Sequence, residues 1–155
     1  MRTIFFMLIG FSSFVVAEEA SRFIKDNTIV IDNKTGLEWQ DDYSDNANII
    51  KSVKWIDAIA YCEELSLNNQ DDWRLPNKKE LFSIVDYSVI NPAMSSVFQE
   101  VDSGYTWSST SYSSRINEGV FAGGTNYAYY LRVSNGIITI DPKYYTKNVR
   151  CVRGG

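Results

Sequence analysis

Apolar side chains recur at helical spacing in the first half of the chain. Between residues 55 and 65 they lie three or four positions apart, which places them on one face of a helix. Ser52 can cap the first turn of this helix, and the polar stretch from Asn68 to Asp72 ends it. The pattern therefore predicts a helix whose buried face carries Trp55, Ile59, Cys62 and Leu65.

A second helix is predicted to begin at Asn77. Pro76 disfavours helical geometry at the residue before it, and the Asn77 side chain can accept hydrogen bonds from the free amides of a first turn. Glu80 follows three residues later, so the segment has the pattern of a capping box. The apolar face of this helix would carry Leu81, Ile84 and Val85.

The second half of the chain has the alternating pattern of β-strands. Asn135-Gly136 predicts a hairpin turn in which both residues take a positive φ. Early helices followed by late strands, with an N-terminal hairpin that must join those strands, indicate an α+β fold. The predicted strands are residues 28–31, 37–39, 105–107, 120–121, 127–133, 137–140 and 149–153.

The N-terminus has the pattern of an export signal. Arg2 precedes an apolar run from Ile4 to Val16, and cleavage after Ala17 would remove residues 1–17. The run is shorter than the roughly 20 residues of a membrane-spanning helix, although an uncleaved anchor is the alternative. Residues 18–27 would form a short N-terminal segment and residues 28–155 one domain. We expect the protein in the periplasm, on the cell surface or secreted, with no membrane span after cleavage.

The chain is acidic, with a formal net charge of −4 that becomes one unit more negative when Arg2 is removed. A molecule with this charge does not as a whole attract phosphate backbones, so nucleic acid is not expected as a partner. Cys62 and Cys151 are the only two cysteines. In an exported protein such a pair indicates a disulfide rather than a reactive site, and the bridge would tie the early helix to the last strand.

Six short motifs occur in the order seen in one bacterial family. In these residues, from about Thr28 to Arg153, the chain resembles the C-terminal domain family named for the Legionella collagen-like adhesin, the Lcl C-terminal domain. The motifs are Thr35-Gly36-Leu37-Glu38-Trp39-Gln40, Trp55 with Ala58 and Tyr61-Cys62, Asp72-Trp73-Arg74-Leu75-Pro76, Glu80-Leu81 with Val85-Asp86, Trp107-Ser108-Ser109-Thr110, and Val149-Arg150-Cys151-Val152-Arg153.

The resemblance implies a C-type-lectin-like fold with two early helices packed on a twisted, mostly antiparallel sheet with long loops. It also implies a disulfide between Cys62 and Cys151. In the adhesin that names the family this domain binds sulfated glycosaminoglycans, whereas this chain is acidic and has no collagen-like Gly-X-Y region. The implied fold is related to that of the formylglycine-generating sulfatase-modifying enzymes. A degenerate relative of those enzymes is a weaker alternative, and it would require free thiols.

Several residues around the start of the second helix are expected to be structural rather than ligand-binding. The Arg74 guanidinium has five donors and would bind loop carbonyls or a carboxylate such as Asp86. This structural motif consists of Trp73, Arg74, Pro76, Asn77 and Glu80.

No catalysis, metal or cofactor is expected. The chain has no histidine, so the hydroxyls of residues 108–110 cannot belong to a Ser-His-Asp triad, and although a serine–lysine pair would remain possible, nothing in the sequence places a lysine near them. Without histidine, and with both cysteines expected in a disulfide, the usual zinc ligand sets are excluded. Asp41, Asp42 and Asp45 could bind calcium, but a solvated acidic loop is the preferred interpretation.

Candidate ligand-binding residues lie in the late, tyrosine-rich segment. Tyrosines interleave there with Arg and Lys, Lys147 among them, and such a surface could stack on a sugar ring while its cations bind a sulfate or carboxylate. By strand alternation Tyr127 and Tyr129 share a face with Leu131, and one of the two faces is expected to be core. The candidates are Tyr112, Arg115, Tyr129, Tyr130, Arg132, Lys143 and Tyr144.

The sequence therefore predicts an exported, non-catalytic, adhesin-like binding module that recognises a polysaccharide or a surface protein. The alternative is a structural or assembly component of the cell envelope that docks a protein partner.

Overall fold

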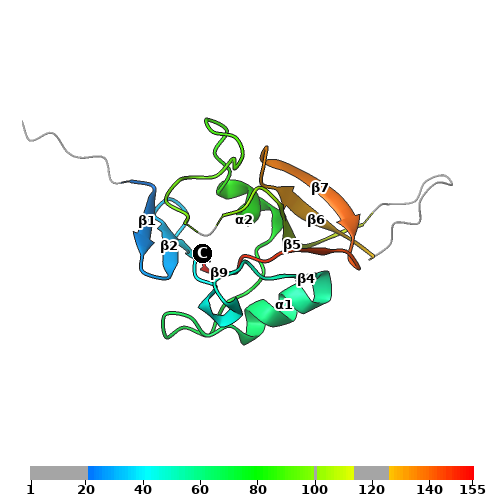
Figure 1. Cartoon of the computed structure of the whole chain (residues 1–155), viewed down its shortest axis with the longest axis horizontal. Coiled ribbons are helices and arrows are strands. Elements are labelled where there is room, and N and C mark those ends of the chain that lie inside the picture. The colour runs from blue at the N-terminus through cyan, green and yellow to red at the C-terminus, as the bar shows by residue number, and fades with distance from the viewer. Residues whose placement is uncertain (1–20, 100, 114–125) are drawn as a thin grey trace, which may run out of the picture.

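The computed structural model describes residues 21–99, 101–113 and 126–155. Its strands form two sheets, which Figure 1 shows to the left and right of the centre of the molecule. The first is antiparallel and has four strands in the order β1-β2-β3-β9. These strands are β1 (Phe23–Asp26), β2 (Ile29–Asp32), β3 (Leu37–Gln40) and β9 (Val152–Gly154).

The second sheet has five strands in the order β4-β8-β5-β6-β7. Its pairings are antiparallel except between β5 and β8, which lie parallel. The strands are β4 (Ser52–Lys54), β5 (Tyr105–Tyr112), β6 (Tyr127–Arg132), β7 (Ile137–Pro142) and β8 (Thr146–Asn148). The predicted α+β class is confirmed, with two sheets in place of the single sheet that we expected.

The first helix, α1 (Trp55–Glu64), begins later than its predicted cap. Ser52 lies in β4, and the residue that precedes the helix is Lys54, whose side chain makes no capping hydrogen bond. Three paired β4 residues therefore replace the capped turn that Ser52 was expected to provide. The predicted buried face holds: Cys62 is fully buried, and Trp55, Ile59 and Leu65 pack against the same core.

The second helix, α2 (Lys78–Ser83), begins with the predicted capping box. The Asn77 side chain accepts hydrogen bonds from the amides of Lys79 at 2.9 Å and Glu80 at 3.0 Å. In return, the Glu80 carboxylate accepts a 2.8 Å bond from the Asn77 amide. The helix ends before Ile84, so it is shorter than its apolar pattern predicted. A short 3₁₀ turn (Ser44–Asn46) lies between β3 and β4 in sequence.

Two hydrophobic cores lie on opposite sides of the strands. Neighbouring strand residues alternate between them, so that Tyr130 belongs to the core beneath α1 and Leu131 to the core around α2. Ile29 and Val30 in the first sheet divide in the same way. One face of β6 is core as expected, since Ala128 and Tyr130 are buried there, while on the other face Leu131 is buried and Tyr127 and Tyr129 remain partly exposed.

Two hairpins have the same kind of turn, a four-residue loop that ends in a glycine with a positive φ. β2 and β3 are closed by the pair Asp32 and Leu37, and β6 and β7 by the pair Arg132 and Ile137. In each loop the glycine alone takes a positive φ, +73° at Gly36 and +71° at Gly136. Asn135 does not, so the prediction of a two-residue turn with two positive φ values is wrong. Four residues form each loop, and a final glycine returns the chain to the strand direction.

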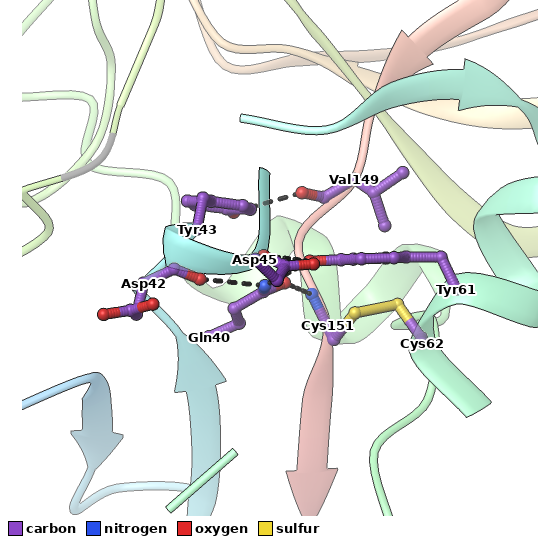
Figure 2. The surroundings of a disulfide bond; sticks show 8 residues. All are labelled: Gln40, Asp42, Tyr43, Asp45, Tyr61, Cys62, Val149 and Cys151. Atoms are coloured by element: carbon purple, nitrogen blue, oxygen red, sulfur yellow. Dashed lines mark hydrogen bonds between the residues drawn. A yellow bond between two sulfur atoms is a disulfide. The ribbon is translucent and has the colours of Figure 1, made fainter. Parts of the chain in front are cut away.

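The disulfide between Cys62 and Cys151 is confirmed, with a Cα–Cα distance of 5.5 Å. It joins α1 to the residue before β9, and Figure 2 shows the buried Gln40 side chain beside it. The Gln40 amide donates to Tyr61 Oη at 2.8 Å and to the Asp42 carbonyl, and its oxygen accepts from the Cys151 amide. The final strand begins later than predicted, so Val149, Arg150 and Cys151 lie before it.

Two predicted segments fall on residues that the structure does not describe: the signal peptide at 1–17 and the strand at 120–121. β1 lies within the segment 18–27, which we had set apart from the domain, and it pairs with β2. Within the described residues, no helix is long and apolar enough to cross a membrane.

Candidate ligand-binding surface

Three tyrosines lie together on one face of the five-stranded sheet. Tyr112 is directly opposite Tyr127 in the β5–β6 register, and its ring makes an edge contact with Tyr129 at a centroid distance of 5.9 Å. The Lys78 ammonium lies 4.2 Å from the Tyr129 ring centroid. All four side chains are partly exposed. We call Lys78, Tyr112, Tyr127 and Tyr129 the tyrosine face.

The start of α2 fixes this arrangement. The Lys78 amide donates to Thr110 Oγ1 at 3.0 Å, and the Ser109 amide donates to the Pro76 carbonyl at 2.8 Å. These bonds tie the first residue of the helix to the middle of β5. They hold the Lys78 side chain over the ring of Tyr129 on the next strand. A cation over an aromatic face at this distance is attracted by the ring quadrupole.

A second aromatic and cationic pair lies on the opposite side of the same end of the sheet. Ser111 and Tyr112 are neighbours in β5, so their side chains point to opposite faces. The Lys143 ammonium lies 2.7 Å from Ser111 Oγ and 3.7 Å from the centroid of Trp55. Burial lowers the pKa of Lys143. The Trp55 ring is fixed in turn by a 2.8 Å bond from its indole N–H to the Ser108 carbonyl.

The turn after β7 adds two exposed rings. Tyr144 and Tyr145 are 65% and 49% exposed, with ring centroids 4.6 Å apart. A hydrogen bond between the two hydroxyls raises the pKa of Tyr144. A surface hollow of about 430 Å³ lies between this turn and the sheet, lined by Asn126, Tyr127, Pro142, Lys143 and Tyr144. The hollow joins the tyrosine face to the Lys143 side of the sheet.

The structure thus divides the predicted ligand-binding residues. Tyr112, Tyr129, Lys143 and Tyr144 lie at one end of the five-stranded sheet, and Tyr127 and Trp55 join them. Tyr130 is only 7% exposed and belongs to the core beneath α1. Arg132 is five residues along β6 from Tyr127, roughly 17 Å at the usual strand rise, and it lies 5.9 Å from the Tyr105 ring. Arg115 lies outside the described residues.

Lys147, interleaved with the candidate tyrosines in the sequence, is a buried cation. Its ammonium lies 4.1 Å from the centroid of Tyr130, 4.9 Å from that of Trp107 and 5.1 Å from that of Tyr105. It also forms an ion pair with Asp141 at 2.5 Å. The ring cluster therefore engages Lys147 inside the protein, and the sequence alone carried no signal of this burial.

The structural motif surrounds the start of α2. Trp73 is buried, and the Arg74 guanidinium forms two hydrogen bonds with the Glu80 carboxylate, at 2.7 and 2.9 Å. Arg74 also donates to the Gly154 carbonyl. The bond to Glu80 raises the pKa of Arg74. Arg74 therefore binds a carboxylate and a carbonyl as predicted, but the carboxylate is that of Glu80 and not that of Asp86. The Asp86 carboxylate instead accepts hydrogen bonds from Ser88.

The three acidic residues considered for calcium have separate partners. Asp41 forms ion pairs with Lys25 and Arg150. Asp42 accepts hydrogen bonds from the amide and hydroxyl of Ser44, which lower its pKa. Across the part of the chain that the structure describes, no cluster of three or more acidic or cysteine side chains has the geometry of a metal site.

Comparison with known proteins gives one family. A family model described as the Lcl C-terminal domain matches residues 28–153, the span over which the motifs resemble that family. No curated protein matches the chain.

Proposed function

The chain belongs to the Lcl C-terminal domain family, and from that premise we propose that it is an exported, non-catalytic, adhesin-like module that binds a polysaccharide. The observation that carries the proposal is that tyrosine, tryptophan and lysine side chains lie on both faces of one end of the five-stranded sheet. Tyr127, Lys143 and Tyr144 line a surface hollow at the same end. The family's name, taken from an adhesin, is consistent with such a role.

The chemistry of this end of the sheet suits a carbohydrate. Tyrosine and tryptophan supply rigid contact area at a low cost in conformational entropy, and the hydroxyls of exposed tyrosines such as Tyr144 can bond to the hydroxyl groups of a sugar. Lys143 and Lys78 lie against these rings, so a sulfate or carboxylate on a bound sugar would meet a cation close to the stacked ring. The hollow beside Tyr127 and Tyr144 is open enough to admit part of a chain.

Absence of catalysis is part of the proposal. The sequence has no histidine, and both of its cysteines form the disulfide. A degenerate relative of the sulfatase-modifying enzymes would need those thiols free. We further propose that the fold is C-type-lectin-like, supported by the pairing of β3 near the N-terminus with β9 at the C-terminus and by the disulfide from α1 to the last segment.

Export is supported by the same disulfide, because such bonds form and persist in oxidising compartments. Whether the module remains in the periplasm or reaches the cell surface is decided by fractionation of the native host.

A glycan array with the oxidised protein tests the binding proposal. We expect a saturable signal from at least one polysaccharide, and we expect the variant Lys143→Gln/Tyr144→Ala to weaken it at least about tenfold. The matched control is Tyr87→Ala, because Tyr87 is 64% exposed against 65% for Tyr144 but lies on another part of the surface. No saturable signal, or equal binding by the Lys143→Gln/Tyr144→Ala variant, would contradict the proposal.

A second candidate function is docking of an envelope protein, favoured by one observation. Phe82, Tyr87, Val89 and Ile90 expose apolar surface close together in the sequence, with Ile90 80% exposed. The rings of Phe82 and Tyr87 are 6.1 Å apart. Contiguous exposed apolar surface of this kind marks interaction sites. Co-purification of one stoichiometric protein by the wild type, but not by Val89→Ser/Ile90→Ser, would favour this function over glycan binding.

A further inference from the structure

β7 is an edge strand with a long open side. It pairs with β6 through six consecutive residue pairs, from Ile137 with Arg132 to Pro142 with Tyr127. It is the last strand in the order of the five-stranded sheet, so no described strand lies on its other side. Figure 1 shows it at the outer margin of the molecule. The backbone groups on that side are available to another strand.

β7 is less protected against pairing than the other edges. Natural edge strands are kept apart by lysines, prolines, bulges or short length, and the one proline of β7, Pro142, is its last residue. β1 has four residues and carries Lys25 and Asp26, while β4 and β9 have three residues each. β7 has six residues, no lysine or arginine, and a continuous register with β6. Its one charged residue, Asp141, is paired with Lys147.

We propose that β7 pairs with β7 of a second copy of this chain, antiparallel and with the two-fold axis at Thr139. In this register Thr139 faces Thr139 of the second copy, and Ile138 faces Ile140 of the second copy. Ile137 faces Asp141 of the second copy. Opposite residues in an antiparallel pair share a face, so the contact is self-complementary, as a two-fold interface must be.

The chemistry of β7 favours a second copy as the occupant. Two chains of net charge −4 repel each other, so a contact between them is most favourable where acidic side chains are absent or neutralised. In the Thr139 register no two like charges stand opposite each other. Ile138 and Ile140 bring four isoleucines together on the face shared with Leu131 and Tyr129. A register centred on Ile140 would place Pro142, which has no N–H, opposite Ile138.

The joined sheet would also present two tyrosine faces on one side, a consequence that rests on the function proposed above. The two-fold axis runs perpendicular to the sheet, so the same face of each copy points in the same direction. Strand spacing and rise place the two Tyr127 residues roughly 25 Å apart. Two sites at this spacing would bind one polysaccharide chain more tightly than either site alone.

Analytical ultracentrifugation of the oxidised wild type tests the contact without any ligand. We expect a reversible monomer–dimer equilibrium over a concentration series up to about 200 μM. Thr139→Lys places two lysines opposite each other and should weaken the dimer at least about fivefold. Ile137→Lys, the matched control two residues away on the same face, places its lysine opposite Asp141 and should leave the dimer as strong or stronger.

A cysteine variant keeps the test decisive if a lysine variant fails to fold. Opposite Cα atoms in an antiparallel pair lie about 4.5–5.5 Å apart, within the range of a disulfide, so Thr139→Cys should form a covalent dimer that reductant separates. Ser88→Cys, at an exposed position outside β7, should not. A wild type that stays monomeric, a dimer insensitive to Thr139→Lys, or the reverse order of the two lysine variants would overturn the proposal. None of these outcomes depends on glycan binding.

Discussion

Lys147 is a charged side chain held inside the protein by aromatic rings. Only 5% of its side chain is exposed, whereas its partner Asp141 is 29% exposed. Lys147→Met keeps most of the apolar stem but removes the cation from the rings and leaves Asp141 unpaired. We expect a loss of about 2 kcal/mol in the free energy of unfolding, measured by urea denaturation. Because Asp141 is the group left without a partner, Lys147→Met/Asp141→Asn should recover part of the loss. A single variant as stable as the wild type would show that the rings do not need the charge.

The carboxyl of Asp32 gives a pH-dependent contribution to stability. Its burial would raise the pKa, but hydrogen bonds from Arg22, Thr35 and the Lys34 amide outweigh that effect and lower it. In the unfolded chain the pKa of an aspartate is about 3.9. Because the pKa is lower in the folded protein, the ionised carboxyl stabilises the fold at pH values above about 3.9, and this contribution is lost as the pH falls through the folded pKa. The difference in stability between the wild type and Arg22→Met should therefore be largest near neutral pH and shrink below about pH 4.

Denaturant unfolding at pH 7, 5, 4 and 3 measures this difference. A constant remainder is expected at low pH, because Arg22 also donates to the Ser83 carbonyl, which does not titrate. A difference that grows as the pH falls would contradict the assignment to Asp32.

At the residue scale, sequence reasoning succeeds where the signal is local or unique. The capping box depends on Asn77 and Glu80 three residues apart, and the disulfide on there being only two cysteines. It fails where the environment comes from distant segments. Lys147 lies beside rings that come from two other strands, β5 and β6, and the Lys143 ammonium lies over the Trp55 ring across nearly 90 residues of chain. No local sequence pattern predicts contacts between residues that lie so far apart in the chain.

The two glycine turns form a matched pair at the scale of elements. Both glycines have a φ near +70°, so alanine at either position incurs the cost of a left-handed backbone, about 1 kcal/mol. A Cβ at Gly36 would meet nothing within 4 Å, whereas a Cβ at Gly136 would lie 2.5 Å from Val85 Cγ1 and 3.0 Å from Tyr87 Cε1. We expect Gly36→Ala to cost about 1 kcal/mol and Gly136→Ala roughly 2–4 kcal/mol, by urea denaturation. Equal losses would mean that Val85 and Tyr87 move away at no cost.

Elements with a strong internal pattern are those that the sequence predicts. α1, α2, β2, β3, β6 and β7 have helical or alternating apolar positions that mark them. β1, β4 and β8 were missed, because their few residues do not show a clear alternation of apolar and polar side chains and their strand geometry comes from pairing with a neighbour. β4 also shows why the cap of α1 was misplaced. Pairing with β8 stabilises residues 52–54 more than one capping hydrogen bond would.

At the scale of the whole molecule, one disulfide joins α1 to the segment just before β9. The disulfide closes a sequence separation of 89 residues, and a loop of that size contributes about 4–5 kcal/mol in the chain-entropy model. Domains of this size have a total stability of about 5–15 kcal/mol, so the loss of the bridge would leave little. We therefore expect Cys62→Ala/Cys151→Ala to be partly unfolded at 37 °C, by circular dichroism and urea denaturation.

The wild type in reductant is the matched control. It lacks the same covalent link but keeps both buried sulfurs, so it should lose most of the stability that the double variant loses. A free-thiol titration of protein taken from the exported fraction supplies the starting state: no thiol should react until reductant is added. If the reduced and oxidised proteins were equally stable, the pairing of β3 with β9 and the hydrogen bonds of Gln40 would suffice to hold the last segment. The expected result makes folding itself depend on an oxidising compartment, so that the tyrosine face would form fully only where the disulfide can form.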